Sequence, residues 1–284
     1  MAFRHILFPV DFSQRTSAAA KHVKAMAACF GSRITMVHAV EDPLKWYGAT
    51  DPVKVVQIDL PKAIREKEHA LHQLAEIEFP NKEVDVVAEL AIPDELIERT
   101  AAKVEADLIM MPSRGQGRFR SALLGSTTVK VLHDLKIPVW TDVHCETAAP
   151  GSHLPVRRIV CAINLEPKSA AVLRCAAAFA KQWNAEMFVA HGVPVTELLL
   201  GEYREVDPPE YMEDFARSQI ADLQREAGTS AEVWLESVPV ADAARNAAQH
   251  HQADLMVIGR GKVTGLMTHA YSIIRESPCP VLSL

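Results

Sequence analysis

The chain has 284 residues, a formal net charge of -6 and 49% hydrophobic residues. This length suits two domains of ordinary size, and the apolar content excludes a disordered chain. The acidic balance gives no positive field for a nucleic acid, and no apolar run reaches the ~20 residues of a membrane helix, so neither nucleic acid nor membrane is expected as a partner.

The cysteines give an indication of the compartment. Their number, five, is odd, they are widely spaced and they form no C-x-x-C pair, which is typical of reduced thiols. The first apolar run is short and is ended by Pro9 and Asp11, so no export signal is expected. The chain is therefore expected to be cytoplasmic.

In chain order, the first half alternates short apolar runs with longer segments of helical period. Apolar runs of about five residues predict parallel strands that are buried on both faces. An irregular segment over residues 42–61 is expected to precede a long charged helix that starts near Lys62. The strands are expected near residues 4–10, 33–40, 84–90, 107–111 and 138–143.

The second half repeats this order. The segment RHILFPVDFS from Arg4 is similar to RRIVCAINLE from Arg157, and ADLIMMPSRG from Ala106 is similar to ADLMVIGRG from Ala253. Each copy is expected to form five strands and four helices in doubly wound order. The predicted fold class is α/β, with two doubly wound parallel five-stranded sheets in tandem.

A short stretch with three helix-breaking residues separates the copies. It spans Glu146 to Val156 and contains Pro150, Gly151 and Pro155. This stretch predicts the linker, so the domains are expected to cover residues 1–145 and 156–284.

The segment after the fourth strand has the features of an anion site. Gly115 is followed after nine residues by Gly125 and Ser126, and Ser126 or Thr127 is expected to cap a helix that runs to about Leu135. The free N–H groups and the positive end of that helix would favour a phosphate, and the glycines would let the backbone approach it closely.

These segments resemble the universal stress protein family. ILFPVDFS, TMVHAV, ADLIMMPSRG and the G-x9-G-S spacing occur in that family's order, and the likeness recurs in each half. The resemblance implies a Rossmann-like fold of the adenine-nucleotide alpha hydrolase type. In ATP-binding members, the first-strand Asp contacts the nucleoside, the residue after the second-strand His lies beside adenine, and the glycine-rich loop holds ribose and phosphates. By position, the resemblance implies a site of Asp11, Ala39, Met111, Arg114, Gly115, Gly125, Ser126 and Thr127.

Both halves depart from the family pattern. Pro112 stands where the family loop has its first glycine, which removes a backbone donor. In the second half, Asn164 replaces the Asp, Gly192 follows the His, and Met267 and Thr268 align with the Gly-Ser. The first half is therefore expected to hold at most one nucleotide, and the second half to be degenerate.

Simpler interpretations stand beside these assignments. Asp11 can cap the first helix without any ligand, and the glycine loop can be an ordinary loop and cap. His38 and His191 end buried strands with no acid or nucleophile beside them, so packing and hydrogen bonding are favoured over catalysis. The pairs His69/His72 and His250/His251 lack a third metal ligand, so surface histidines and no metal site are expected.

No Ser-His-Asp set, paired carboxylates or Cys-His nucleophile is recognisable, so no enzyme is predicted. The resemblance implies a stress-response regulatory protein that binds ATP or ADP, with or without Mg²⁺, and hydrolyses ATP slowly or not at all. The alternative is an interaction or scaffold module without nucleotide. A nucleotide-dependent transferase is a third class, for which no acceptor residues are recognisable.

The two halves are expected to pair through their last strands as an internal pseudo-dimer, and two chains to form a homodimer.

Overall fold

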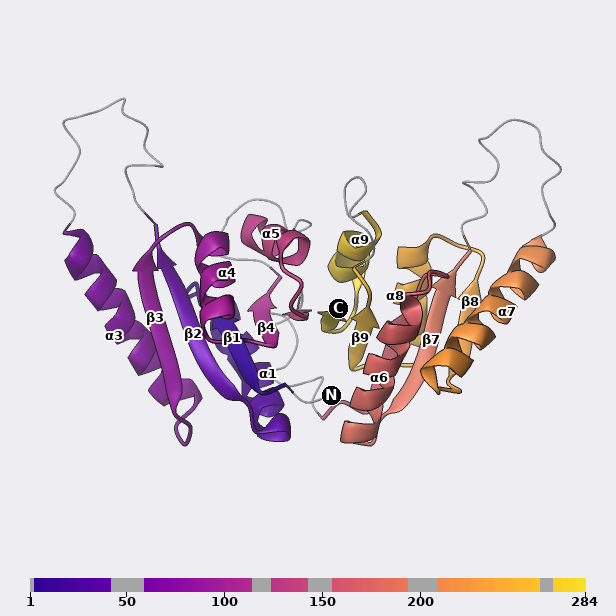
Figure 1. Cartoon of the computed structure of the whole chain (residues 1–284), viewed down its shortest axis with the longest axis horizontal. Helices are drawn as coiled ribbons and strands as arrows, with labels where there is room; N and C mark the ends of the chain where they lie inside the picture. Colours follow the sequence, from indigo (N-terminus) through magenta and orange to yellow (C-terminus); the bar gives the residue numbers. More distant parts are fainter. Residues whose placement is uncertain (1–2, 42–58, 114–123, 143–154, 194–208, 261–267) are drawn as a thin grey trace, which may run out of the picture. The chain divides into compact units, whose positions relative to one another are not determined.

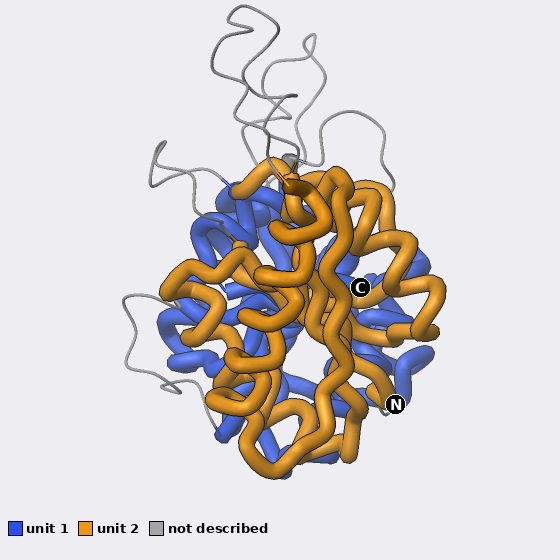
Figure 2. The backbone as a smooth tube through the Cα atoms, turned by 90° about the vertical axis from the view of Figure 1, so that its left-hand side faces the viewer, with its two compact units in different colours: residues 1, 120–124, 140–284 blue, residues 2–119, 125–139 orange. Residues whose placement is uncertain are grey.

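The computed structural model describes residues 3–41, 59–113, 124–142, 155–193, 209–260 and 268–284. The backbone divides into two compact units (Figure 2), one of residues 2–119 and 125–139 and the other of residues 1, 120–124 and 140–284. Within the described ranges, no helix is long and apolar enough to cross a membrane.

The first repeat is a parallel α/β sheet. Its strand order is β3-β2-β1-β4-β5, with β1 paired in parallel to β2 and β4, and β2 to β3. The strands are β1 (His5–Pro9), β2 (Arg33–Val40), β3 (Val84–Leu90), β4 (Leu108–Pro112) and β5 (Val139–Asp142). The helices are α1 (Gln14–Phe30), α3 (Leu60–Glu78), α4 (Pro93–Lys103) and α5 (Ser126–Asp134). The predicted doubly wound order is confirmed.

Helices cover both faces of this sheet, which explains why its central strands are apolar throughout. The helix α1 contacts α3 on one face, and α4 contacts α5 on the other (Figure 1). The side chains of β1 and β4 are almost fully buried between these layers, and the largest of them include Phe8, Leu108 and Ile109.

The long charged helix α3 begins two residues before the expected Lys62. Asp59 is its N-cap, and its carboxylate accepts a hydrogen bond from the Lys62 N–H at 2.9 Å. Pro61 lies in the first turn, where its missing N–H costs nothing. An acidic cap followed by proline is a strong helix start, so local sequence alone sets this boundary.

The second repeat has the same order, β8-β7-β6-β9-β10, among its described strands. These are β6 (Arg158–Ala162), β7 (Glu186–Gly192), β8 (Glu232–Glu236), β9 (Leu255–Ile258) and β10 (Val281–Ser283). Its helices are α6 (Ser169–Trp183), α7 (Pro209–Ala227), α8 (Val240–His250) and α9 (Thr268–Glu276). The two repeats therefore share one architecture.

The end of β5 falls in the same compact unit as the second repeat. Residues Trp140–Asp142 are grouped with residues 155–284 in that unit, and the Thr141 hydroxyl donates to the Val281 carbonyl at 3.4 Å. The compact units thus divide inside β5, before the linker expected at residues 146–156. The expected pairing of the two repeats as wholes stays a prediction.

An aspartate at the start of the fourth strand ties the amino edge of each sheet together. Asp107 accepts from the N–H groups of Arg4 and His5 at 2.9–3.0 Å. Asp254 accepts from the N–H groups of Arg157 and Arg158 at 2.8 and 3.0 Å. The Asp in each ADL segment is therefore structural, and it lies at the edge opposite the loops that carry the candidate site.

Candidate functional site

The candidate site lies at the carboxyl edge of the first repeat. In the order β3-β2-β1-β4-β5, successive strands are added to one side of β1 up to β3, and then to its other side from β4 on. The boundary between β1 and β4 is therefore the topological switch point, where open α/β sheets bind ligands. Asp11 follows the end of β1, Ala39 is the penultimate residue of β2, and Met111 is the penultimate residue of β4. The structure thus places these predicted residues on adjacent strand ends.

The Asp11 carboxylate organises the turn between β1 and α1. Its Oδ1 accepts from the Ser13 N–H at 3.0 Å, and from the hydroxyls of Ser13 and Thr16 at 2.7 Å each. Ser13 is the N-cap of α1, yet its own side chain makes no capping hydrogen bond. One oxygen of Asp11 therefore holds the turn before α1 together, and the carboxylate is held in a fixed orientation.

His38 connects the end of β2 to this turn. Its Nδ1 lies 2.7 Å from the Val10 carbonyl, which can only accept, so Nδ1 carries the proton. Burial of the imidazole lowers the pKa of His38 below its ordinary value, and the Lys67 ammonium lowers it further. His38 is thus a neutral hydrogen-bonded side chain, which matches the packing role expected for it.

Phe12 and Lys67 also lie here, and the sequence analysis did not single them out. The Phe12 ring meets the His38 ring edge to face with centroids 4.7 Å apart. The Lys67 ammonium, from α3, lies 4.9 Å from the centroid of the Phe12 ring. No motif signals this contact, because it depends on where α3 packs.

Two hydrogen bonds join the end of β4 to the start of α5. The Gly125 N–H donates to the Ser113 carbonyl at 2.9 Å, and the Thr128 hydroxyl donates to the Pro112 carbonyl at 3.3 Å. These bonds fix the start of α5 beside the end of β4. The N–H groups of the first turn, from Ser126 to Thr128, have no acceptors within the helix and carry the positive end of its dipole.

The expected cap of this helix is corrected. The N-cap is Gly125 rather than Ser126 or Thr127, and it has no side chain that could accept a capping hydrogen bond. Gly125 has φ -63° and ψ 145°, an extended conformation that any residue adopts. Ser126 is exposed at the first helical position, which leaves its hydroxyl at the carboxyl edge. Arg114 and Gly115 lie outside the described residues.

Pro112 is the last residue of β4 and is buried. Met111 beside it is 7% exposed, so its side chain belongs to the core. Ala39 is half-buried and pairs in register with Glu89 of β3. Of the implied binding residues that the structure describes, Met111 is therefore the one whose side chain is enclosed by the fold.

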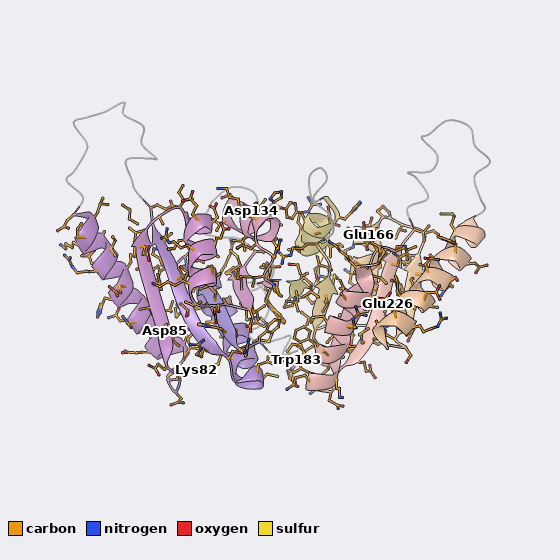
Figure 3. All side chains as sticks on the ribbon, viewed as in Figure 1. Lys82, Asp85, Asp134, Glu166, Trp183 and Glu226 are labelled. Carbon is orange, nitrogen blue, oxygen red and sulfur yellow. The ribbon has the colours of Figure 1, made fainter. Side chains whose placement is uncertain are left out.

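The second repeat preserves the hydrogen bonds of this turn and changes the side chain that accepts them. The Asn164 Oδ1 accepts from the Glu166 N–H at 3.3 Å and from the Ser169 hydroxyl at 2.7 Å. His191 donates its Nδ1–H to the Ile163 carbonyl at 2.9 Å, as His38 does in the first repeat. Glu166 marks this edge in Figure 3, and Trp183 at the end of α6 marks the opposite edge. The turn therefore forms with an amide as well as with a carboxylate.

The position after His191 is closed by backbone. A Cβ added to Gly192 would lie 2.7 Å from the Val238 carbonyl oxygen and 2.9 Å from the Val240 Cα. Ala39 has that Cβ at the equivalent place in the first repeat. The start of α8 therefore packs against β7 more closely than a side chain allows, at the position that the family resemblance places beside adenine.

Three buried thiols are held in their protonated form. Burial raises the pKa of Cys175 to about 11 and that of Cys279 to about 12, and it raises the pKa of Cys161 further still. His251 differs from the expected surface histidine, because its ring stacks on Phe188 with centroids 3.8 Å apart. In the described ranges, no three His, Cys, Asp or Glu side chains are placed to hold a metal ion.

Comparison with known proteins identifies the family. The model of the universal stress protein family matches residues 2–142 and again residues 155–284. The chain belongs to the universal stress protein family. A universal stress protein of Mycolicibacterium smegmatis is 25% identical over 298 residues, which cover 98% of this chain and 95% of that protein.

Universal stress proteins of single-domain length match about half of the chain. One from Methanocaldococcus jannaschii is 28% identical over 153 residues, which cover 48% of this chain and 93% of that protein. The solved structure of a universal stress protein from Archaeoglobus fulgidus has a TM-score of 0.70 at 21% identity and covers 99% of this chain and 97% of its own. That likeness shows the fold, and the tandem arrangement predicted from the internal repeat is confirmed.

Proposed function

We propose that this universal stress protein is a non-catalytic regulatory protein that binds ATP or ADP in its first repeat, while the second repeat stays empty. Any hydrolysis of ATP is slow in this proposal, because the sequence has no recognisable Ser-His-Asp set, paired carboxylates or Cys-His nucleophile. The ligand binds with or without Mg²⁺, and its binding changes the conformation or the choice of partner.

One observation carries this proposal. The Asp11 turn and the Gly125 helix start lie at the ends of β1 and β4, the two strands that flank the switch point. Asp11 offers a carboxylate to sugar or base donors, and the first turn of α5 offers N–H groups to phosphate oxygens. A nucleotide has both sugar or base donors and phosphate oxygens, and the distance between them suits two sites on neighbouring strands.

The second repeat supports occupancy of one site only. It has an amide at Asn164, and backbone closes the space beside Gly192. Losing the charge-assisted contacts of Asp11 and the loop, at about 1.5–3 kcal/mol each, would weaken a micromolar site to beyond millimolar.

The scaffold alternative also has a specific observation in its favour. The Oδ1 atoms of Asp11 and Asn164 accept equivalent hydrogen bonds, so the carboxylate has a structural use that needs no ligand. Pro112 adds to this, because it offers no N–H at the strand end. A scaffold would use the same fold to present surfaces to other proteins.

Titration calorimetry with ATP and ADP separates these functions. We expect a stoichiometry near one per chain, with binding abolished or strongly weakened by Gly125→Leu combined with Ser126→Ala. Gly259→Ala in the second repeat is the matched control, and it should leave the affinity unchanged. Mass spectrometry of small molecules released from denatured, freshly purified protein gives an independent check.

The outcomes are distinct. Two equivalent sites, or one site that responds to Gly259→Ala alone, would contradict the assignment to the first repeat. No heat of binding and no co-purified nucleotide would favour the scaffold, and the first variant to test would then be Pro112→Gly, which restores the missing donor.

A further inference from the structure

Phe12 directly follows Asp11, and its backbone lies in the left-handed region with φ 58°. This region is unfavourable for a large side chain, so the surroundings must impose it. Apart from glycines, only Phe12, Glu105, Asn184 and Gln252 have positive φ in the described part of the chain. Phe12 alone among these lies beside the candidate site.

Two contacts hold the Phe12 ring in place. His38 at the end of β2 meets it edge to face at 4.7 Å, and His38 is itself bonded to the Val10 carbonyl at 2.7 Å. The Lys67 ammonium lies 4.9 Å from the ring centroid, which is a cation–π distance. The ring is therefore fixed between β2 and α3.

The position of the Phe12 ring restricts the backbone conformation at Asp11. Asp11 and Phe12 are consecutive, so the direction of the Phe12 side chain determines how the backbone leaves Asp11. The same turn holds the Asp11 Oδ1 on Ser13 and Thr16. Ring and carboxylate are thus anchored from two sides of one short turn.

The second repeat lacks this arrangement. Leu165 stands at the position of Phe12 and does not have positive φ. The helices α3 and α7 both have 19 residues, and Ala216, which is 1% exposed, stands at the position of Lys67. The aromatic ring and the cation therefore occur in the repeat that carries the carboxylate, and in the described residues of the other repeat both are replaced.

We propose that Phe12 and Lys67 are positioning residues for Asp11 in nucleotide binding. The Lys67 ammonium and the His38 ring hold Phe12 in its left-handed conformation, and this conformation aims the Asp11 carboxylate at the ligand. The inference rests on the proposed function of the first repeat, and it assigns a role to Phe12, within the ILFPVDFS segment, and to Lys67, outside the segments that resemble the family.

Calorimetry with ATP on four variants of the full chain tests this role. Phe12→Leu, which installs the second-repeat residue, and Lys67→Met, which keeps the stem without the charge, should each weaken ATP binding about two- to tenfold. Lys67→Arg keeps a cation over the ring and should stay within about twofold of the wild type. Lys62→Met is the matched control on the same helix, and it should leave the affinity unchanged.

A double-mutant cycle separates positioning from direct contact. If Phe12 acts through Asp11, Phe12→Leu has no further effect in an Asp11→Asn background, because the group that it orients is already lost. Additive losses would show that the ring contacts the ligand independently, and this would overturn the positioning role. A readout without ligand is the His38 titration by NMR, where Lys67→Met should raise the pKa of His38.

The remaining outcomes also decide. Wild-type binding that is unchanged by both Phe12→Leu and Lys67→Met overturns the inference and leaves the proposed function standing. Absence of binding in the wild type rejects the proposed function, and the inference with it. If thermal unfolding shows that Phe12→Leu is not folded, Lys67→Met decides, because Lys67 is exposed and its loss leaves the core intact.

Discussion

Asp11 and Asn164 occupy equivalent positions, their Oδ1 atoms accept equivalent hydrogen bonds, and the side chains differ in one atom and one charge. This pair separates what the fold needs from what a ligand needs. The turn requires an acceptor at Oδ1, which both side chains provide. A sugar hydroxyl or a base amino group requires a second acceptor, which only the carboxylate provides.

Asp11→Asn should therefore weaken nucleotide binding without unfolding the protein. We expect the dissociation constant for ATP to rise about ten- to a hundredfold, since one charge-assisted hydrogen bond is lost. The free energy of unfolding should change by less than about 0.5 kcal/mol, because the Asn164 Oδ1 accepts the equivalent hydrogen bonds in the second repeat. Calorimetry and urea unfolding measure the two effects on one sample. A large loss of stability with unchanged affinity would assign Asp11 to the fold alone.

Gly192 gives a second prediction at this scale. Gly192→Ala should lower the free energy of unfolding by about 1–3 kcal/mol, because its Cβ would lie 2.7 Å from the Val238 carbonyl oxygen, and backbone cannot easily move away. Gly259→Ala is the control, since its Cβ would meet only the Val172 Cγ2 at 3.1 Å. Equal costs at both positions, measured by urea unfolding, would contradict the close packing of α8 on β7.

At the scale of elements, the strands were predictable because parallel strands buried on both faces leave short apolar runs in the sequence. β2 and β3 were expected near residues 33–40 and 84–90, and they span Arg33–Val40 and Val84–Leu90. The cap of α5 was misplaced by one or two residues, because a glycine cap has no side-chain oxygen to reveal it. The sequence analysis assigned Gly125 to close approach of the backbone to a phosphate. Its φ of -63° is one that any residue adopts, so the backbone conformation does not require glycine there.

The contact between Lys67 and Phe12 was not predictable from sequence. It joins residues 55 positions apart, and it forms only once α3 packs on the sheet beside β2. The positive φ of Phe12 has no sequence signal either, since residue type predicts a left-handed backbone conformation mainly for glycine and asparagine. The general location of the site could be predicted, whereas the residues that orient it could not.

The strand-end histidines predict a pH dependence of stability. Burial lowers the folded-state pKa values of His38 and His191 below 6.5, so the unfolded chain binds protons first as the pH falls. The stability that these residues contribute is complete above about pH 6.5 and is lost as the pH falls towards the folded-state values. Urea unfolding at pH 7.5 and 5.5 should show a lower free energy of unfolding at pH 5.5, and His191→Gln should reduce that difference. A difference that is unchanged in His191→Gln would contradict the assignment.

At the scale of the whole molecule, the internal repeat and the two family matches show that one domain fold occurs twice in the chain. The two copies have kept their strand order and their strand-end histidines, while the residues around the candidate ligand have diverged. Under the proposed function, the features that the two copies share serve the fold, and the residues that differ include those expected to contact the ligand.

We expect two chains to associate as a homodimer, since a charge of -6 opposes association only modestly. Light scattering should then give a mass near twice the 31.3 kDa of one chain. A species of 31.3 kDa alone at micromolar concentration would show a monomer. Addition of ATP during the measurement would reveal any link between ligand and assembly.

His38 and His191 make the same bond, to the Val10 and Ile163 carbonyls, in two copies of one turn. Every sample of this protein therefore carries its own reference: two imidazoles at equal concentration, temperature and pH, one beside the candidate site and one beside its altered counterpart. In an NMR titration with nucleotide, errors in ligand concentration and in buffer affect the His38 and His191 resonances equally. The difference between the two resonances therefore reports the effect of the ligand on the first copy.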